Sequence, residues 1–159
     1  MTTEHARFWE IISGMTAAMV TTHDGTVIRA RPMAAFIDED ARTIRFVTDN
    51  DSHKIDELCR DNNLCLSFAD EKKMLYASVS GTGHVSHDRD LIKKLWGPYC
   101  DVFFSGGAEN ADVAVITIDP SQAEYWDNDK GAVSMAVEMT KAYFSDHGPN
   151  LGDNAKLSM

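Results

Sequence analysis

Alternation of apolar and polar residues dominates the first 120 positions and predicts a mainly β (α+β) protein. Strands are predicted at residues 15–22, 27–37, 43–48, 64–69, 75–85 and 113–118. The Asp24-Gly25 pair between the first two runs is a strong signal for a tight β-hairpin turn. Asp119-Pro120 should stop the sixth strand, because proline cannot donate to a sheet ladder. Six strands at hairpin spacing favour a closed or half-closed antiparallel barrel.

Short helical patterns flank these strands. Helices are predicted at residues 4–12, directly after Ser52, and at 88–96, with 97–110 as a loop. Residues 133–144 fit either a helix or a strand followed by a helix. From Asp146 onward small and polar residues dominate, which indicates a flexible tail or a loosely docked arm. The prediction is therefore one domain over residues 1–145 and a tail over 146–159.

Composition narrows the class of protein. A chain of 159 residues with 43% apolar residues can bury one ordinary core. Its formal charge of −10 argues against nucleic acid or an anionic membrane surface as a partner. The three cysteines form no CxxC pair, and the N-terminus lacks a signal-peptide pattern. No apolar run approaches the roughly 18 residues of a membrane span. We therefore expect a cytoplasmic protein that builds any anion site locally.

The second predicted strand carries a concentrated positive charge. Because side chains alternate along a strand, Arg29, Arg31 and Met33 should share one face. The other face, formed by Ile28 and the residues that alternate with the arginines, should pack against the rest of the protein. One face of this strand can then bind an anion.

A second cationic feature follows the third predicted strand. Val47 and Thr48 end that strand, and Ser52 is a good N-cap for the helix behind it. Backbone N–H groups, the positive end of the helix dipole and Lys54 would then meet at one point. This arrangement predicts a phosphate site without a P-loop.

Short segments in order along the chain resemble a known family. They are Asp24-Gly25, Arg31-Pro32-Met33, Phe46-Val47-Thr48, Ser52-His53-Lys54, Leu66-Ser67-Phe68, Val79-Ser80-Gly81, Leu95-Trp96 and Glu124-Tyr125-Trp126. Together they resemble the FMN-binding split-barrel family typified by pyridoxamine 5′-phosphate oxidase, and most closely its bacterial general stress protein branch. The resemblance covers roughly residues 6–127. It implies a six-stranded antiparallel split barrel with short flanking helices, and a homodimer with FMN at the subunit interface.

The resemblance also implies which residues contact the cofactor. They are Arg31, Pro32, Met33, Val47, Thr48, Ser52, His53, Lys54, Tyr76, Trp96 and Trp126. Arg31, Ser52 and Lys54 would hold the phosphate, and Thr48 with the Val47 backbone would meet the flavin ring edge or ribityl chain. The family often has a second basic residue where His53 stands. Arg29 is expected to be a solvent-facing neighbour.

Three functions remain open at this point. The first is a flavin-dependent oxidoreductase of unknown substrate, and the second is a non-catalytic protein that binds or sequesters flavin. The third is a haem or deazaflavin binder on the same barrel. True pyridoxamine phosphate oxidases clasp the substrate phosphate with an arginine- and histidine-containing segment after the position of Trp126. Here an acidic stretch follows and no arginine occurs after Arg89, so we expect negligible oxidation of pyridoxamine or pyridoxine phosphate.

Overall fold

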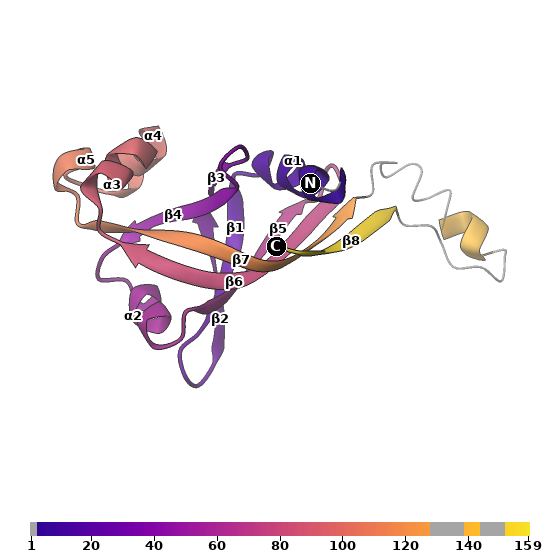
Figure 1. Ribbon diagram of the computed structural model, residues 1–159, viewed down its shortest axis with the longest axis horizontal. Helices are drawn as coiled ribbons and strands as arrows, with labels where there is room; N and C mark the ends of the chain where they lie inside the picture. The colour runs from indigo at the N-terminus through magenta and orange to yellow at the C-terminus, as the bar shows by residue number, and fades with distance from the viewer. Residues whose placement is uncertain (1–2, 128–138, 144–151) are drawn as a thin grey trace.

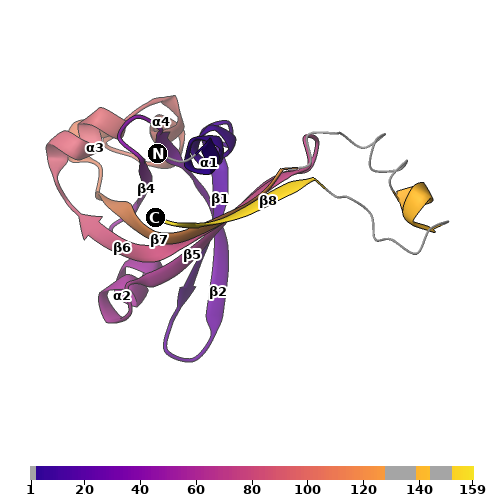
Figure 2. The ribbon, with the colours of Figure 1, turned by 45° about the vertical axis from the view of Figure 1, so that its right-hand side comes forward.

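The computed structural model describes residues 3–127, 139–143 and 152–159 (Figure 1). Its strands are β1 Ala17–His23, β2 Ile28–Ala34, β3 Phe36–Asp38, β4 Thr43–Asp49, β5 Asn63–Asp70, β6 Leu75–Ser86, β7 Val113–Asp127 and β8 Asp153–Ser158. They form one sheet in the order β2-β1-β5-β6-β7-β4-β3, and β8 pairs with β7. Every pairing is antiparallel. The sheet twists strongly and its two ends curl toward one another as a half-barrel (Figures 1 and 2).

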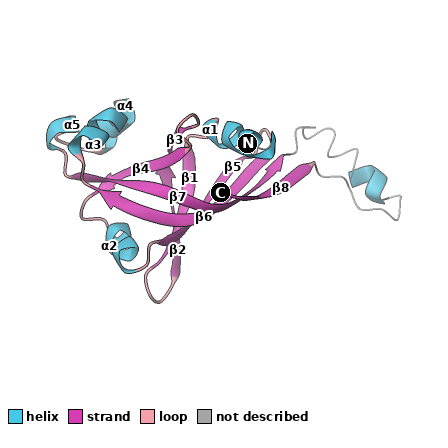
Figure 3. Cartoon of the chain, viewed as in Figure 1, coloured by secondary structure: helices cyan, strands magenta, loops and turns pink. Residues whose placement is uncertain are grey.

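Within residues 3–127, five short helices flank the sheet (Figure 3). They are α1 Thr3–Ser13, α2 His53–Arg60, α3 Arg89–Leu95, α4 Pro98–Phe103 and α5 Gly107–Asn110. In both ribbon views α2 and the group α3–α5 lie at the same end of the sheet, whereas β8 extends toward the other end (Figures 1 and 2). Among the described residues, no helix is long and apolar enough to cross a membrane.

The mainly antiparallel β architecture is confirmed, but the number of strands is not. Six strands were expected and the described residues form eight. The run predicted at 27–37 divides at Ala35, whose N–H donates to the carbonyl of Thr16. The chain then leaves β1, and β3 pairs with β4 instead. The Asp24-Gly25 hairpin is present, and Gly25 takes the left-handed φ of 99° that such a turn favours.

The prediction that Asp119-Pro120 stops a strand is wrong, because β7 continues to Asp127. Along one edge, β7 pairs with β4 as far as Ile118 and with β8 from Gln122. Pro120 lies between these two ladders, where a missing N–H removes no bond to either strand. Along the other edge the register with β6 shifts between Ser80 and Gly81. Proline is therefore tolerated at the bulge where β7 exchanges one partner for another.

The chain beyond Trp126 also departs from the prediction. A flexible tail or a loosely docked arm was expected from Asp146; residues 153–158 instead form the strand β8, and Leu157 is buried in the main core. Of the segment 133–144, residues 139–143 are helical, and the remainder lies outside the described residues. Residues 97–110 were expected to be a loop but contain α4 and α5. Short, weakly periodic segments such as these give little local signal.

Two apolar clusters hold the fold together. The larger one packs α1 against the inner face of the sheet, with Phe8, Phe46 and Leu66 fully buried. The smaller one joins α3 and α4 to β4 and β7 through Ile92, Cys100 and neighbouring valines. Burial of this kind contributes about 1.5–3 kcal/mol for each large apolar side chain. The smaller cluster fixes α4 beside the end of β4.

The faces of β2 are reversed relative to the sequence prediction. Met33 is buried, and the partly buried Arg31 pairs with Glu57 of α2, so the face with the cations points inward toward α2. The alternate face was expected to pack, but Ile28 is 75% exposed and Pro32 is also exposed. An amphipathic pattern defines two faces and does not say which one is covered.

Candidate functional site

One cleft of about 310 Å³ lies between β2, β4, the start of α2 and α4. Its lining residues are Arg31, Pro32, Met33, Ala34, Val47, Thr48, Asp49, Lys54, Tyr99, Phe103 and Phe104. The volume is at the lower end of the range of about 300–1,000 Å³ for small-molecule sites. Strand and helix ends that are distant in sequence therefore meet at one concave surface.

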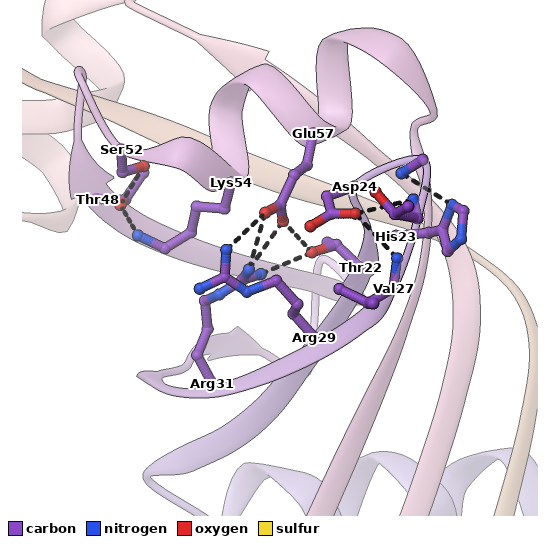
Figure 4. A network of polar contacts seen from close by, with 12 residues as sticks. Thr22, His23, Asp24, Val27, Arg29, Arg31, Thr48, Ser52, Lys54 and Glu57 are labelled. Atoms are coloured by element: carbon purple, nitrogen blue, oxygen red, sulfur yellow. Dashed lines mark hydrogen bonds and ion pairs between the residues drawn. The ribbon is translucent and has the colours of Figure 1, made fainter.

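Lys54 forms one side of the cleft (Figure 4). Its Nζ donates to Thr48 Oγ1 at 2.5 Å, and Thr48 in turn donates to Ser52 Oγ at 3.2 Å. Burial lowers the pKa of the Lys54 ammonium and the charge of Arg31 lowers it further, against the opposing effects of Asp49 and Glu57. An anion placed beside Lys54 would reverse part of this shift. The site thus favours a negatively charged ligand.

Arg31 is held by an internal network that joins β1, β2 and α2 (Figure 4). Its Nη1 donates to Thr22 Oγ1 at 2.6 Å, and its Nη2 lies 2.8 and 3.1 Å from the two carboxylate oxygens of Glu57. Thr22 also donates to Glu57. Arg29 is more exposed and reaches the same carboxylate at 3.9 Å. The expectation that Arg29 is only a solvent-facing neighbour therefore misses a contact.

Glu57 is a buried carboxylate, with 4% of its surface exposed. Burial alone would raise its pKa, but hydrogen bonds from Thr22 and Arg31 and the charges of the two arginines outweigh that effect. The pKa of Glu57 consequently lies below its ordinary value, and the group stays ionised. Its charge orients Arg31 toward the cleft.

These residues keep hydrogen-bonding capacity for a phosphate. A guanidinium has five N–H donors, and the three bonds to Thr22 and Glu57 leave two for a ligand. The Lys54 ammonium has three donors, one of which is directed at Thr48. Charge-assisted bonds from Arg and Lys to phosphate are stronger than neutral ones. The donors present therefore fit a phosphate group.

Aromatic side chains form another part of the same cleft. Tyr99 and Phe103, one turn apart on α4, have ring centroids 4.5 Å apart and planes inclined by 32°. Phe104 follows directly at the end of the helix. The cleft thus combines cations with apolar rings, which suits a ligand that has both an anionic and a planar part.

The structure brings together six of the eleven residues predicted for cofactor binding. Arg31, Pro32, Met33, Val47, Thr48 and Lys54 all line the cleft. Ser52 lies behind Thr48 and directly precedes α2, as expected of an N-cap, but its side chain makes no capping hydrogen bond.

The other four predicted residues do not line the cleft. His53 is exposed at the start of α2. Trp96 caps the end of α3 and donates through Nε1 to Asp101 at 2.7 Å. Tyr76 and Trp126 are register partners on β6 and β7, and Trp126 is exposed. Within one subunit the latter pair therefore lies apart from the Arg31 region.

Sequence reasoning missed several residues of the site. Glu57 follows Lys54 by three positions on the same helix, a spacing that could have suggested a paired charge. Tyr99 and Phe103 are four residues apart behind Pro98, which is a weak signal for a short helix with an aromatic face. Thr22 carried no signal, because its contact depends on the pairing of β1 with β2.

The fold is an antiparallel half-barrel with a cleft lined by Arg31 and Lys54 beside a helix start, and comparison with known sequences gives the family. The profile described as "Pyridoxamine 5'-phosphate oxidase like" matches residues 3–150. The chain therefore belongs to the pyridoxamine 5′-phosphate oxidase-like family. Protein bli-3 of Neurospora crassa is 30% identical over an alignment of 135 residues, and the match covers 78% of this chain and 65% of that protein. The chain thus spans just under two thirds of the length of this relative.

Solved structures agree with the fold. A candidate general stress protein 26 from Jannaschia sp. CCS1 superposes with a TM-score of 0.77 at 24% identity, over 97% of this chain and 96% of that one. The general stress FMN/FAD binding protein of Xanthomonas citri gives a TM-score of 0.71 at 27% identity, over 80% and 91% of the two chains. The split-barrel fold and the similarity to general stress proteins are thereby established.

Proposed function

We propose that this protein binds FMN in the cleft between β2, β4, α2 and α4, with the phosphate at Arg31, Thr48, Ser52 and Lys54. The observation that carries the proposal is the convergence of Arg31 and Lys54 on one cleft from separate elements. The flavin-binding description of the Xanthomonas citri relative supports it. FMN is favoured over riboflavin because only FMN carries the phosphate that these cations fit.

The proposal includes a homodimer. The outer faces of β1, β2, β5 and β6 carry small, uncharged or apolar residues that alternate with the buried ones: Met19, Thr21, Ala30, Pro32, Cys65, Ser67, Ser78 and Ser80. Charged residues make up 25% of the chain, so a face of this composition favours association. Tyr76 and Trp126 extend the same face. In the proposed dimer they reach toward the flavin of the partner subunit.

The activity proposed for the assembled protein is that of a flavin-dependent oxidoreductase acting on a small molecule. Bound FMN would supply the hydride or electron chemistry. The residues of this chain bind the phosphate, orient the cofactor and exclude water from it. We expect negligible turnover of pyridoxamine phosphate, because the sequence after Trp126 is acidic and contains no arginine to bind the substrate phosphate.

Titration of Lys54→Ala with FMN and with riboflavin tests the phosphate site. The loss of one charge-assisted bond, about 1.5–3 kcal/mol, should weaken FMN binding roughly ten- to a hundred-fold. Riboflavin should be affected little. Lys54 is the residue of choice because its removal leaves the pair of Arg31 and Glu57 intact, and calorimetry reports both affinities.

Lys93→Ala is the matched control. Lys93 forms an exposed ion pair with Glu109 and does not line the cleft, so both flavins should bind this variant as they bind the wild type. Equal losses for FMN and riboflavin in Lys54→Ala would mean that Lys54 does not contact the phosphate.

A non-catalytic flavin-binding protein is the second candidate, because the same cleft serves both roles. Anaerobic addition of NADH or NADPH to the flavin-loaded protein separates them. Bleaching of the flavin absorbance followed by reoxidation with an acceptor supports the oxidoreductase. A flavin that stays oxidised favours binding or sequestration.

A further inference from the structure

The helix α4 presents two aromatic rings to the cleft while remaining firmly attached to the protein. Cys100 is fully buried beneath it, and Trp96 donates to Asp101 of the same helix. Tyr99 and Phe103 nevertheless keep 43% and 61% of their surfaces exposed. Large apolar side chains left open on a fixed helix are characteristic of a binding surface.

The composition of the cleft identifies the chemistry of the ligand. Arg31, Thr48 and Lys54 provide donors for an anion, whereas Met33 and Val47 provide aliphatic surface. Tyr99 and Phe103 provide a face of aromatic rings. A ligand that matches this lining joins an anionic group to a flat apolar ring system.

We infer that Tyr99 and Phe103 form a stacking platform for the isoalloxazine ring, and that α4 therefore sets affinity for the ring as the cations set affinity for the phosphate. This inference rests on the proposed binding of FMN. Offset or tilted stacking on an aromatic side chain is favourable and tolerant of ring type. Met33 and Val47 contribute apolar surface to the same cleft.

The inferred platform gives a role to α4, a helix in which the family resemblance implies no cofactor-contacting residue. The aromatic residues named by the resemblance are Tyr76, Trp96 and Trp126, none of which lines the cleft. Tyr99 and Phe103 do line it and come from the same subunit as Lys54. A single subunit therefore provides both halves of the recognition.

Three probes distinguish the two halves: FMN has ring and phosphate, riboflavin has the ring alone, and ribose 5-phosphate has the phosphate alone. Each is titrated into the full-length wild type, Tyr99→Ala/Phe103→Ala and Lys54→Ala. Ribose 5-phosphate is measured by its competition with FMN. The aromatic variant should bind FMN and riboflavin roughly 5- to 30-fold more weakly and ribose 5-phosphate unchanged. Lys54→Ala should bind FMN and ribose 5-phosphate more weakly and riboflavin as the wild type does.

Val102→Ala is the matched control, because Val102 lies between the two aromatics on α4, is 79% exposed and does not line the cleft. It should bind all three probes as the wild type does. Circular dichroism of the variants verifies that each is folded.

The aromatic platform is refuted if Tyr99→Ala/Phe103→Ala binds FMN and riboflavin as tightly as Val102→Ala does. That result would leave the phosphate site intact, provided that Lys54→Ala still loses affinity for FMN. A wild-type protein that binds no flavin would instead overturn the proposed function and the platform with it.

Discussion

At the scale of single residues, the pairing of Glu57 with Arg31 gives the cleft its charge pattern. A buried carboxylate beside two arginines removes part of the positive charge, but it also fixes the guanidinium of Arg31 in one orientation. Two of the five Arg31 donors then remain for a ligand. The sequence suggests an arginine that is free to bind an anion, and the structure shows one that is already anchored.

Glu57→Gln should destabilise the protein at neutral pH. The amide keeps the shape of the carboxylate but loses its charge, so we expect a loss of about 1–3 kcal/mol in the free energy of unfolding. Urea denaturation measures the loss. Glu109→Gln is the control, because Glu109 belongs to an exposed ion pair and should change stability by less than about 1 kcal/mol.

The same variant predicts a pH dependence. The folded pKa of Glu57 lies below its ordinary value of 4.5, so the carboxylate contributes stability above that value. This contribution disappears as pH falls through the lower, folded pKa. The difference in stability between wild type and Glu57→Gln should therefore shrink in acid. A difference that stays constant from about pH 7 to below pH 4 would contradict the lowered pKa.

Sequence reasoning located much of the candidate site because its cations lie at recognisable places. Arg31 alternates along a strand, and Lys54 follows the serine at the start of α2. It could not find Thr22 or Glu57, since their contacts depend on how β1, β2 and α2 pack. Nor could it show that Tyr76 and Trp126 lie away from the cleft within one subunit. Side-chain proximity across elements is a tertiary property.

At the scale of elements, β7 connects the two ends of the molecule. It pairs with β6 from Val115 to Asp127, with β4 in its first half and with β8 in its second. The bulge opposite Gly81 is where the change of partner takes place. A Cβ on Gly81 would lie 2.3 Å from the carbonyl oxygen of Asp119. The backbones of β6 and β7 therefore approach each other so closely at Gly81 that a residue with a Cβ atom would not fit there.

Gly81→Ala should separate the two strands at this bulge. We expect a loss of about 1–3 kcal/mol, or more, because the clash is with backbone that cannot rotate away. For a chain of this size the melting temperature should fall by roughly 3–10 °C, as calorimetry would show. At Gly14 an added Cβ makes only ordinary contacts, the nearest at 3.6 Å. A Gly14→Ala protein that lost as much stability as Gly81→Ala would exclude a specific clash.

The elements that the sequence predicted well are the long, strongly periodic ones. The strands near residues 43–48, 64–69 and 75–85 appear with small shifts of their ends. The sequence did not predict β8, whose alternation of apolar and polar residues covers only six positions, or α4, a helix of only six residues. β8 exists because β7 offers it an edge and Leu157 enters the core. Tertiary pairing overrides weak local preference at both places.

At the scale of the whole molecule, the proposed dimer explains why the outward faces of β1, β2, β5 and β6 carry mostly small, uncharged residues. Light scattering should then report about twice the chain mass of 17.6 kDa. Met19→Glu places a charge on that face beside Pro32 and Ser67, and should shift the protein toward monomer because an unpaired buried charge is costly. Val102→Glu adds the same charge to exposed α4 and should leave the mass unchanged. A wild-type monomer that retains FMN would rule out the dimer.

The return of the chain from β7 to β8 has a consequence for how this protein can diversify. Asp127 and Asp153 face each other in register, so the chain leaves β7 and enters β8 at neighbouring points. The register of this ladder places no requirement on the number of residues that join the two strands. Doubling the length of such a connection costs only about 0.6 kcal/mol of loop-closure entropy. Evolution, or a protein engineer inserting a reporter peptide, can therefore lengthen the connection between these two strands at a small cost in loop-closure entropy.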